Sequence, residues 1–270
     1  MRDLAARHAI RPSKSLGQNF LVDPNLARAI AAEAGIGSGD LVVEIGAGLG
    51  SLTLALAATG AEVLAVEFDR AIVPALLEVV ADDARIRVLV ADAMRVDWLE
   101  VLGEGSWTMA SNLPYNIAVP LVLEMLERAP GVGRFVVMVQ REVGERLAAG
   151  PGDEAYGAVS VRVAYRAAAR VVRRVPPDVF WPAPKVESVV VRLERLDAPA
   201  VDADPGRLWA VVDAGFAQRR KTMRNAVRRL GLSGDDADAA LRAAGIDPQA
   251  RAESLGLPAF ARLAGTIDRA

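Results

Sequence analysis

The chain of 270 residues contains no cysteine and only one histidine. Disulfides, thiolate metal sites and cysteine nucleophiles are therefore excluded, and so is any metal site built from several histidines. The sequence also lacks an apolar run of about 18 residues and the apolar core of a signal peptide, so we expect a cytoplasmic protein. Its chemistry must depend on carboxylates, amides, hydroxyls, aromatic rings and a bound cofactor.

The chain as a whole also has no excess of basic over acidic residues. The formal net charge of −2 does not indicate a uniformly basic nucleic-acid binder. Between Gly157 and Arg229, however, 15 Lys and Arg stand against 7 Asp and Glu, a local balance of +8 that leaves −10 for the remainder. This segregation indicates either a surface for a polyanion or solvated helix faces, and charge alone does not distinguish them.

Short β-branched runs alternate with helical stretches in the first two thirds of the chain. A helix is predicted to begin with Asp23 as N-cap and Pro24 in its first position, and to run toward Gly35. The alternation predicts right-handed βαβ units and a doubly wound, Rossmann-like α/β sheet that is mostly parallel, with an antiparallel hairpin at its edge. We predict strands at 41–45, 62–66, 86–90, 108–111 and 135–140, and the hairpin pair near 159–166 and 187–193.

A second, smaller domain is predicted after this sheet. Residues 197–206 are rich in Pro, Ala and Asp and are typical of a linker. The rest of the chain is helical in pattern, with boundaries expected at Gly231, Gly245 and Gly256. We therefore predict an α/β domain at residues 1–196 and a small all-helical domain at residues 207–270.

A glycine-rich turn marks a candidate ligand site. Gly46, Gly48 and Gly50 follow a predicted strand and precede a predicted helix, so the backbone can turn tightly and approach a ligand closely. Ser51 stands where a dinucleotide-binding GxGxxG motif has its third glycine, which weakens a nicotinamide interpretation. A purely structural turn remains an alternative for the glycines taken alone.

Two acids at the ends of the next predicted strands strengthen the ligand interpretation. Glu67 can accept both hydroxyls of a ribose, and Asp92 can accept from an adenine amino group. Either acid alone could be a solvated strand end. Open α/β sheets bind ligands where their strands end, so these features at successive strand ends indicate a nucleoside-like cofactor.

The tetrapeptide Asn112-Leu113-Pro114-Tyr115 follows the next predicted strand. An amino group conjugated to a ring is a poor nucleophile, so an enzyme that alkylates it must offer acceptors for its N–H bonds and a flat surface for its ring. Asn112 and the carbonyl of Pro114 can accept, and Tyr115 can stack through its ring alone. The pattern is typical of N6-adenine and N4-cytosine methyltransferases that use S-adenosylmethionine.

From its N-terminal region to its last helix, the chain resembles the ribosomal RNA small-subunit adenine dimethyltransferases, the kasugamycin-resistance methylase family. The segments occur in order and with sensible spacing, which makes the resemblance specific. They are Lys14–Leu21 (KSLGQNFL), the Gly46–Gly50 loop, Glu67, Asp92, Asn112–Tyr115, Phe180–Ser188 (FWPAPKVES) and Phe216–Asn225 (FAQRRKTMRN).

The resemblance implies S-adenosylmethionine as cofactor and assigns roles to matched positions. It implies that the target adenine lies against Asn112, the Pro114 carbonyl and Tyr115, and that Phe180 closes over the other face of the base. The base must be unpaired or flipped out to enter such a site. The residues implied to contact the cofactor are Gln18, Asn19, Leu21, Gly46, Gly48, Glu67, Asp92 and Asn112.

The same resemblance makes the helical domain an RNA-recognition domain. Read as one helix, Lys221, Arg224 and Arg228 fall on one stripe, while Met223 and Val227 belong to a stripe that can pack inward. Phosphate contacts from such a stripe position the protein without reading base sequence. The predicted RNA-binding residues are Arg219, Arg220, Lys221, Arg224 and Arg228.

These observations predict a monomeric enzyme that dimethylates N6 of two adjacent adenosines near the 3′ end of small-subunit (16S) ribosomal RNA, acting on the assembling 30S subunit. A macrolide-resistance methylase acting on large-subunit RNA is the nearest alternative, and Phe180–Ser188 and Arg219–Lys221 favour the small subunit. A non-catalytic assembly factor is the other alternative. The presence of Glu67, Asp92 and Asn112 argues against it. The net charge of −2 departs from the basic balance expected for this substrate.

Overall fold

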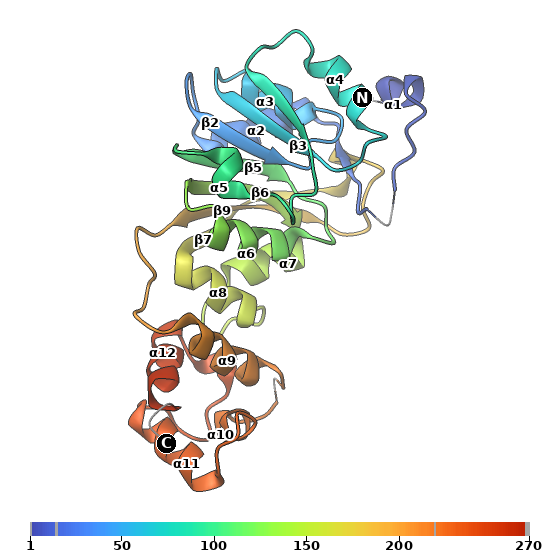
Figure 1. Ribbon diagram of the computed structural model, residues 1–270. Helices are drawn as coiled ribbons and strands as arrows, with labels where there is room; N and C mark the ends of the chain where they lie inside the picture. The colour runs from blue at the N-terminus through green and yellow to red at the C-terminus, as the bar shows by residue number, and fades with distance from the viewer. Residues whose placement is uncertain (1, 14–15, 219, 268–270) are drawn as a thin grey trace. The chain divides into compact units, whose positions relative to one another are not determined.

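A computed structural model of the chain describes residues 2–13, 16–218 and 220–267. The described residues form two compact units, whose elements are labelled in Figure 1. Unit 1 contains the described residues up to Glu145 together with Ala168–Arg195. Unit 2 contains Arg146–Ala167 and the described residues from Leu196 onward.

Within the described residues, unit 1 is built on a seven-stranded sheet in the order β4-β3-β2-β5-β6-β9-β7. The pairs β2–β3, β3–β4, β2–β5 and β5–β6 are parallel, whereas β9 runs antiparallel to β6. The predicted fold class, a mostly parallel Rossmann-like sheet with antiparallel pairing toward one edge, is confirmed. The strands are β2 (Leu41–Ile45), β3 (Glu62–Glu67), β4 (Ile86–Val90), β5 (Trp107–Asn112), β6 (Val132–Gln140), β7 (Ala167–Val175) and β9 (Ser188–Arg195).

Helices cover both faces of this sheet. On one face, Ile30 of α2 and Leu56 of α3 share a buried cluster with Val136 of β6. On the other, Gly144 of α7 packs against Val139 of β6 and Val189 of β9, because successive side chains of a strand point to opposite faces. The helices and 3₁₀ turn of this part of the chain are α1 (Arg2–Arg7), α2 (Pro24–Ala34), α3 (Ser51–Ala57), α4 (Val73–Val80), α5 (Trp98–Leu102), α6 (Ala118–Arg128), α7 (Arg141–Ala148) and η1 (Pro177–Val179).

The start of α2 follows the sequence prediction. Asp23 accepts hydrogen bonds from the backbone N–H groups of Asn25 and Leu26 at 2.7 and 3.0 Å, and Pro24 occupies the first turn. Gly35 ends the helix with a φ of 62°, a left-handed conformation that favours glycine. The local capping residues therefore suffice to fix both ends of this helix.

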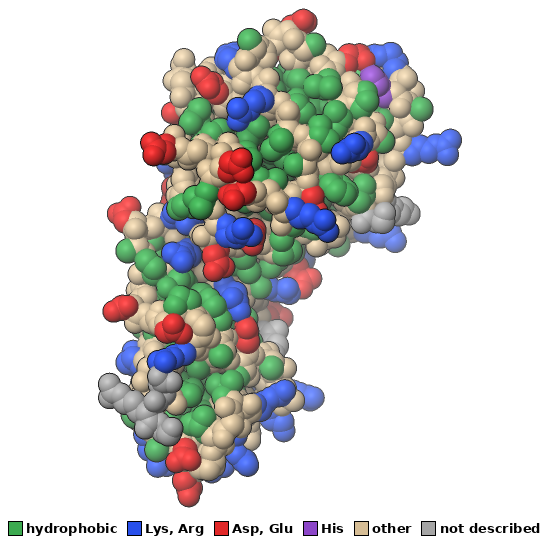
Figure 2. Space-filling view, viewed as in Figure 1, with side chains coloured by type: hydrophobic (Ala, Val, Ile, Leu, Met, Phe, Trp, Pro, Cys, Tyr) green, Lys and Arg blue, Asp and Glu red, His purple; other side chains and the backbone are tan. Residues whose placement is uncertain are grey.

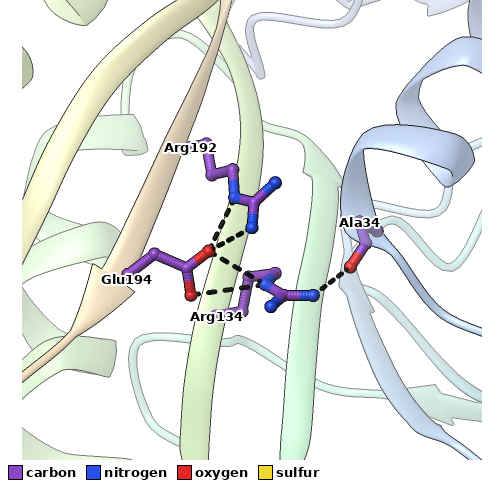
Figure 3. A network of polar contacts seen from close by, with 4 residues as sticks. All are labelled: Ala34, Arg134, Arg192 and Glu194. Atoms are coloured by element: carbon purple, nitrogen blue, oxygen red, sulfur yellow. Dashed lines mark hydrogen bonds and ion pairs between the residues drawn. The ribbon is translucent and has the colours of Figure 1, made fainter.

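The C-terminal end of α2 is tied to the sheet by a network of charged groups, shown in Figure 3. Arg134 of β6 donates to the carbonyl of Ala34 at 2.9 Å and, through Nε, to Glu194 of β9 at 3.1 Å. Arg192 also donates to Glu194, at 2.6 Å. A cation at a helix C-terminus satisfies a carbonyl that has no partner within the helix. The network thus fixes α2 against β6.

A second, two-stranded sheet joins two distant segments of unit 1. β1 (Phe20–Leu21) pairs antiparallel with β8 (Phe180–Trp181), so that Phe20 lies opposite Trp181. Their rings stack with centroids 6.0 Å apart. Neither strand is predictable from the sequence, because two residues are too few to show a period.

The sheet order places a ligand crevice at a definite point. From β2 the chain proceeds to β3 and β4 on one side, whereas β5 returns to the other side of β2 and β6 follows it outward. The strand order therefore reverses between β2 and β5. In open α/β sheets, ligands bind at the carboxyl ends of the strands beside such a reversal.

Unit 2 is helical in the described residues. Its buried core includes Leu208, Val212, Leu241, Phe260 and Leu263. None of the helices in the described part of the chain is long and apolar enough to cross a membrane. The elements of unit 2 are α8 (Ala158–Arg166), α9 (Pro205–Phe216), α10 (Met223–Arg228), α11 (Gly234–Ala243), η2 (Ala252–Ser254) and α12 (Leu257–Thr266).

The strand predicted near residues 159–166 is wrong, because this segment forms α8. The alternation Val159-Ser160-Val161 resembles a strand, but the Ser160 hydroxyl accepts from the Gly157 backbone N–H and caps a helix. Val161 and Tyr165, four residues apart, then face the core of unit 2. The segment 146–167, which the prediction placed in the first domain, accordingly belongs to unit 2.

The last helices broadly follow the predicted boundaries. Gly231 and Gly245 have positive φ values of 101° and 70° just after α10 and α11. Gly256 instead precedes α12 as its N-cap. Of the stretch read as one helix, Arg224 and Arg228 lie in α10, whereas Lys221 precedes it and lies beyond the end of α9 at Phe216.

Candidate active site

A cavity of about 290 Å³ lies in unit 1 at the carboxyl ends of β2, β3, β4 and β5. Its wall is completed by the segment that leads into β1. The structure thus brings together every cofactor position that the sequence analysis assigned and three of the four positions assigned to the target base. These lining residues are Gln18, Asn19, Leu21, Gly46, Gly48, Glu67, Asp92, Asn112, Pro114 and Tyr115.

The glycine turn is packed too closely for side chains. Gly46 has a φ of 80°, and a Cβ there would lie 3.2 Å from the Pro114 Cδ. Gly48 has a φ of 55°, and its Cβ would lie 3.0 Å from the Phe20 ring. Both positions therefore favour glycine by conformation and by space. The turn lies directly against the Asn112–Tyr115 segment, so a ligand above the turn would adjoin that segment.

Glu67 is held in place by backbone groups at the end of β3. Its side chain is 7% exposed, and its two carboxylate oxygens accept from the N–H groups of Gly48 and Asp69, each at 2.8 Å. Burial raises the pKa of Glu67, and the backbone hydrogen bonds oppose this rise. The carboxylate is therefore fixed in orientation at the cavity wall.

A second buried carboxylate, Glu44, also lines the cavity, and the sequence analysis gave it no role. It is 1% exposed, and one of its oxygens lies 2.5 Å from the hydroxyl of Thr53. Burial, opposed by the Thr53 hydrogen bond and assisted by the nearby charge of Glu67, raises the pKa of Glu44 to about 8. In the sequence, Glu44 could have been noticed as an acid inside an otherwise apolar strand, two residues before the first glycine of the turn.

The raised pKa of Glu44 predicts a pH-dependent stability. An unfolded chain ionises this group above its ordinary pKa of 4.5, whereas the folded protein keeps the proton up to about pH 8. The folded state then binds more protons, so the free energy of unfolding falls as the pH rises through this interval. Glu44→Gln, which cannot ionise, should remove a destabilisation on the order of 3 kcal/mol at neutral pH.

Chemical denaturation between pH 5 and pH 8 measures this effect. The wild-type protein should lose more stability across the interval than Glu44→Gln. Glu62→Gln, at an exposed position of β3, provides a control with the same chemical change. If wild type and Glu44→Gln show the same pH dependence, Glu44 is not a neutral acid in the folded protein.

Two other polar residues of the cavity, Gln18 and Asp92, interact with neighbouring residues of the protein. Gln18 donates from Nε2 to Asp69 at 2.8 Å and accepts from the backbone of Ser13 at 2.7 Å. Asp92 accepts from the Met94 N–H at 3.0 Å, and its other oxygen forms a 3.5 Å ion pair with the exposed Arg95. Asp92 is partly exposed to solvent, whereas Glu44 and Glu67 are buried.

The Asn112–Tyr115 segment carries two hydrogen-bond acceptors at the wall of the cavity. Asn112 donates through Nδ2 to the carbonyl of Asn19 at 3.0 Å, which orients the amide and leaves its oxygen as an acceptor. The Pro114 carbonyl accepts from the Ile117 N–H at 3.2 Å and retains a second lone pair. Ser111, buried just before this segment, accepts from the Ile45 N–H at 2.8 Å. This bond holds the segment beside the glycine turn.

Phe180 does not line the cavity in this structure. Its side chain is 2% exposed and belongs to the buried cluster that contains Leu21 and Leu26. Its position in β8, opposite Leu21 of β1, accounts for this burial. The structure therefore gathers Asn112, Pro114 and Tyr115 but not Phe180.

The predicted RNA-binding residues lie in unit 2, except that Arg219 is outside the described residues. Arg220, Lys221 and Arg228 are exposed, and Figure 2 shows Lys and Arg side chains gathered beside α10. Arg224 is less available, since its Nε donates to Asp238 of α11 at 2.7 Å. Over unit 1, the same view shows basic and acidic side chains interspersed. Among the described members of the predicted set, Arg220, Lys221 and Arg228 are therefore the most accessible to RNA phosphates.

The described residues contain no cluster of three or more His, Asp or Glu side chains that could hold a metal ion.

Two solved structures share this fold over most of their length. A dimethyladenosine transferase from Plasmodium falciparum superposes with a TM-score of 0.76 at 23% identity, covering 90% of this chain and 95% of that one. The 23S rRNA methyltransferase ErmE superposes with a TM-score of 0.72 at 24% identity, covering 93% and 100%. The chain thus shares its fold with these two proteins.

The chain belongs to the ribosomal RNA adenine dimethylase family, whose model matches residues 10–268. Ribosomal RNA small subunit methyltransferase A of Thermobifida fusca is 48% identical over 269 residues, covering 98% of this chain and 93% of that protein. Its counterpart from Kineococcus radiotolerans is 47% identical over 268 residues, covering 98% and 89%. Members of this family are rRNA adenine dimethyltransferases, a group of S-adenosylmethionine-dependent enzymes, and the predicted enzyme class is confirmed.

Proposed function

We propose that the cavity of unit 1 binds S-adenosylmethionine. The acidic residues among its described lining are Glu44, which keeps its proton near neutral pH, and Glu67, Asp69 and Asp92, and none of the described lining residues is Lys, Arg or His. Such a lining disfavours a phosphate-bearing dinucleotide and favours a ligand with a net positive charge. S-adenosylmethionine carries a sulfonium and an ammonium, and when bound it supplies an activated methyl group. The residues therefore fit this cofactor.

Glu67 and Asp92 are proposed to hold the nucleoside part of the cofactor. Glu67 lies at the end of β3 with both oxygens fixed by backbone N–H groups, so its remaining lone pairs can accept from ribose hydroxyls. Asp92 lies beyond the end of β4 and faces the same cavity. The close approach of Gly46 and Gly48 provides a surface without side chains for the rest of the ligand.

The substrate amine is proposed to lie between Asn112 and Pro114. This assignment rests on a single observation, the hydrogen bond from Asn112 Nδ2 to the Asn19 carbonyl. Because the amide nitrogen is engaged in this bond, the amide oxygen is available as an acceptor for the substrate. Two acceptors next to each other suit the two N–H bonds of an adenine N6 amine. Tyr115 offers a ring for stacking, worth about 1–3 kcal/mol per base. The chain's own contribution is then alignment of the amine with the methyl group.

We further propose that the substrate is small-subunit ribosomal RNA, with two adjacent adenosines near its 3′ end each dimethylated on an assembling subunit. The relatives from Thermobifida and Kineococcus, both named small-subunit methyltransferases, support this choice. The enzyme is proposed to act as a cytoplasmic monomer, with the exposed basic residues beside α10 contacting phosphates. Phosphate contacts of this kind orient the RNA, while an unpaired or flipped base enters the cavity.

The choice of subunit can be tested with labelled S-adenosylmethionine. Small and large ribosomal subunits from cells lacking the endogenous enzyme are incubated separately with the purified protein and the labelled cofactor. We expect label in the small-subunit RNA alone. Label in the large-subunit RNA would support a macrolide-resistance type of activity, and no transfer to either subunit, despite cofactor binding, would support a non-catalytic assembly factor.

A further inference from the structure

The phenol of Tyr115 has a partner within the protein. Its oxygen lies 2.9 Å from the hydroxyl oxygen of Ser188, a residue 73 positions later in the chain. Ser188 is completely buried, whereas Tyr115 lines the cavity. The Tyr115 hydroxyl is therefore turned toward the interior of unit 1, and burial raises the pKa of this phenol, opposed by the Ser188 hydrogen bond.

Ser188 is itself held rigidly. It is the first residue of β9 and pairs with Gln140 of β6. The preceding residue, Glu187, accepts from the backbone N–H of Arg141 at 2.9 Å, and its side chain forms a 3.3 Å ion pair with the same residue. A hydroxyl fixed by two strands can fix its partner, as side chains supported by rigid elements do in preorganised sites.

The hydrogen bonds of the residues next to Tyr115 do not act on its ring. Its neighbours Asn112 and Pro114 are fixed by hydrogen bonds to Asn19 and Ile117, but these act on an amide and on a backbone carbonyl. Among the described residues, the hydrogen bond to Ser188 is the polar contact that acts on the ring itself. A tyrosine tied at its hydroxyl can neither rotate out of the cavity nor slide along the base.

We propose that Ser188 is a positioning residue, which holds the Tyr115 ring in the plane where it stacks the target adenine. This proposal rests on the proposed function of the cavity and extends it to a residue outside the cavity wall. The Tyr115 hydroxyl contributes to alignment of the base and does not contact the reacting amine. Ser188 acts only through Tyr115, and this restriction makes the proposal testable.

A double-mutant cycle separates positioning from independent effects. Ser188→Ala and Tyr115→Phe should each slow single-turnover methyl transfer on small subunits by about tenfold, since a small misplacement of a reactant can cost up to 10²-fold. The double variant should be no slower than the slower single variant, because both changes remove one interaction. Cofactor affinity should stay unchanged in all three. Losses that multiply to about 100-fold in the double variant, or single variants as fast as wild type, would overturn the proposal.

Two controls test whether the variants lose activity through a general loss of structure. Ser160→Ala removes another buried serine hydroxyl, which donates to the Arg146 carbonyl at 2.6 Å in unit 2, and it should leave methyl transfer unchanged. The chain has only three tyrosines, so ¹³Cζ-tyrosine NMR gives three signals, and Tyr115→Phe identifies one of them. Ser188→Ala should shift that signal and leave those of Tyr156 and Tyr165 in place.

The NMR result does not depend on the substrate. If the wild-type protein fails to methylate small-subunit RNA, the proposed function fails, while the shift of the Tyr115 signal still decides whether Ser188 holds the ring. An unshifted Tyr115 signal in Ser188→Ala would overturn the positioning role even if methylation by the wild type is normal.

Discussion

Asn112→Ala is expected to slow methyl transfer by about 10²–10³-fold, the usual scale for removing one preorganised hydrogen-bonding group from a reacting centre. The Asn112 amide donates to the Asn19 carbonyl, and Asn112 and Pro114 both line the cavity. Removing it deprives the adenine amine of an acceptor during attack, so both methylation steps should slow. Binding of RNA through unit 2 should be unaffected.

Single-turnover assays with excess enzyme, scored for mono- and dimethyladenosine, measure this loss. Asn25→Ala is a control with the same change, because Asn25 is an exposed residue of α2 outside the cavity. Cofactor affinity, measured by calorimetry, shows how much of the loss arises in cofactor binding. If Asn112→Ala retains a rate close to that of wild type, the amide does not accept from the amine.

Reversal of Arg220, Lys221 and Arg228 to Glu is expected to weaken RNA association by about 100-fold or more and to flatten its salt dependence. Each lost phosphate contact reduces the slope of log K against log salt by about 0.9 for a duplex and less for single strands. All three residues are exposed, and no ion pair with an acid engages them among the described contacts of unit 2. Arg224 is left in place, since reversal would break its ion pair with Asp238.

A control variant carries the same change of charge at Arg28, Arg87 and Arg242, which are exposed positions outside the proposed contact surface. It should retain nearly full RNA affinity, and both variants should bind S-adenosylmethionine normally because none of the substituted residues lines the cavity. Equal loss of RNA affinity in the two variants would show that overall charge, and not the surface beside α10, controls docking.

The parts of the fold that depend on local chemistry were predictable from the sequence. Asp23, Pro24 and Gly35 fix α2 through contacts within a few residues. Glu67, Asp92 and Asn112 could be placed at one edge because parallel strands end on the same side of a sheet. The structure gathers these three side chains around one cavity.

The features that sequence reasoning missed depend on contacts between distant segments. Helix α8 was mistaken for a strand because Val159, Val161 and Val163 alternate, while the core that selects the helix comes mainly from residues after 204. The bond between Tyr115 and Ser188 spans 73 positions, and no periodicity in the sequence indicates it. Glu44 was given no role from the sequence, because its significance lies in burial, which only the packed sheet reveals.

The most direct test of the central claim is to map the methyl groups that the purified protein adds. Undermethylated small subunits are treated with the enzyme and S-adenosylmethionine, and the RNA is digested and analysed by mass spectrometry. The proposed function predicts N6,N6-dimethyladenosine at two adjacent positions near the 3′ end, and their loss with Asn112→Ala. Methyl groups on another base, at another site, or undiminished in Asn112→Ala would contradict it.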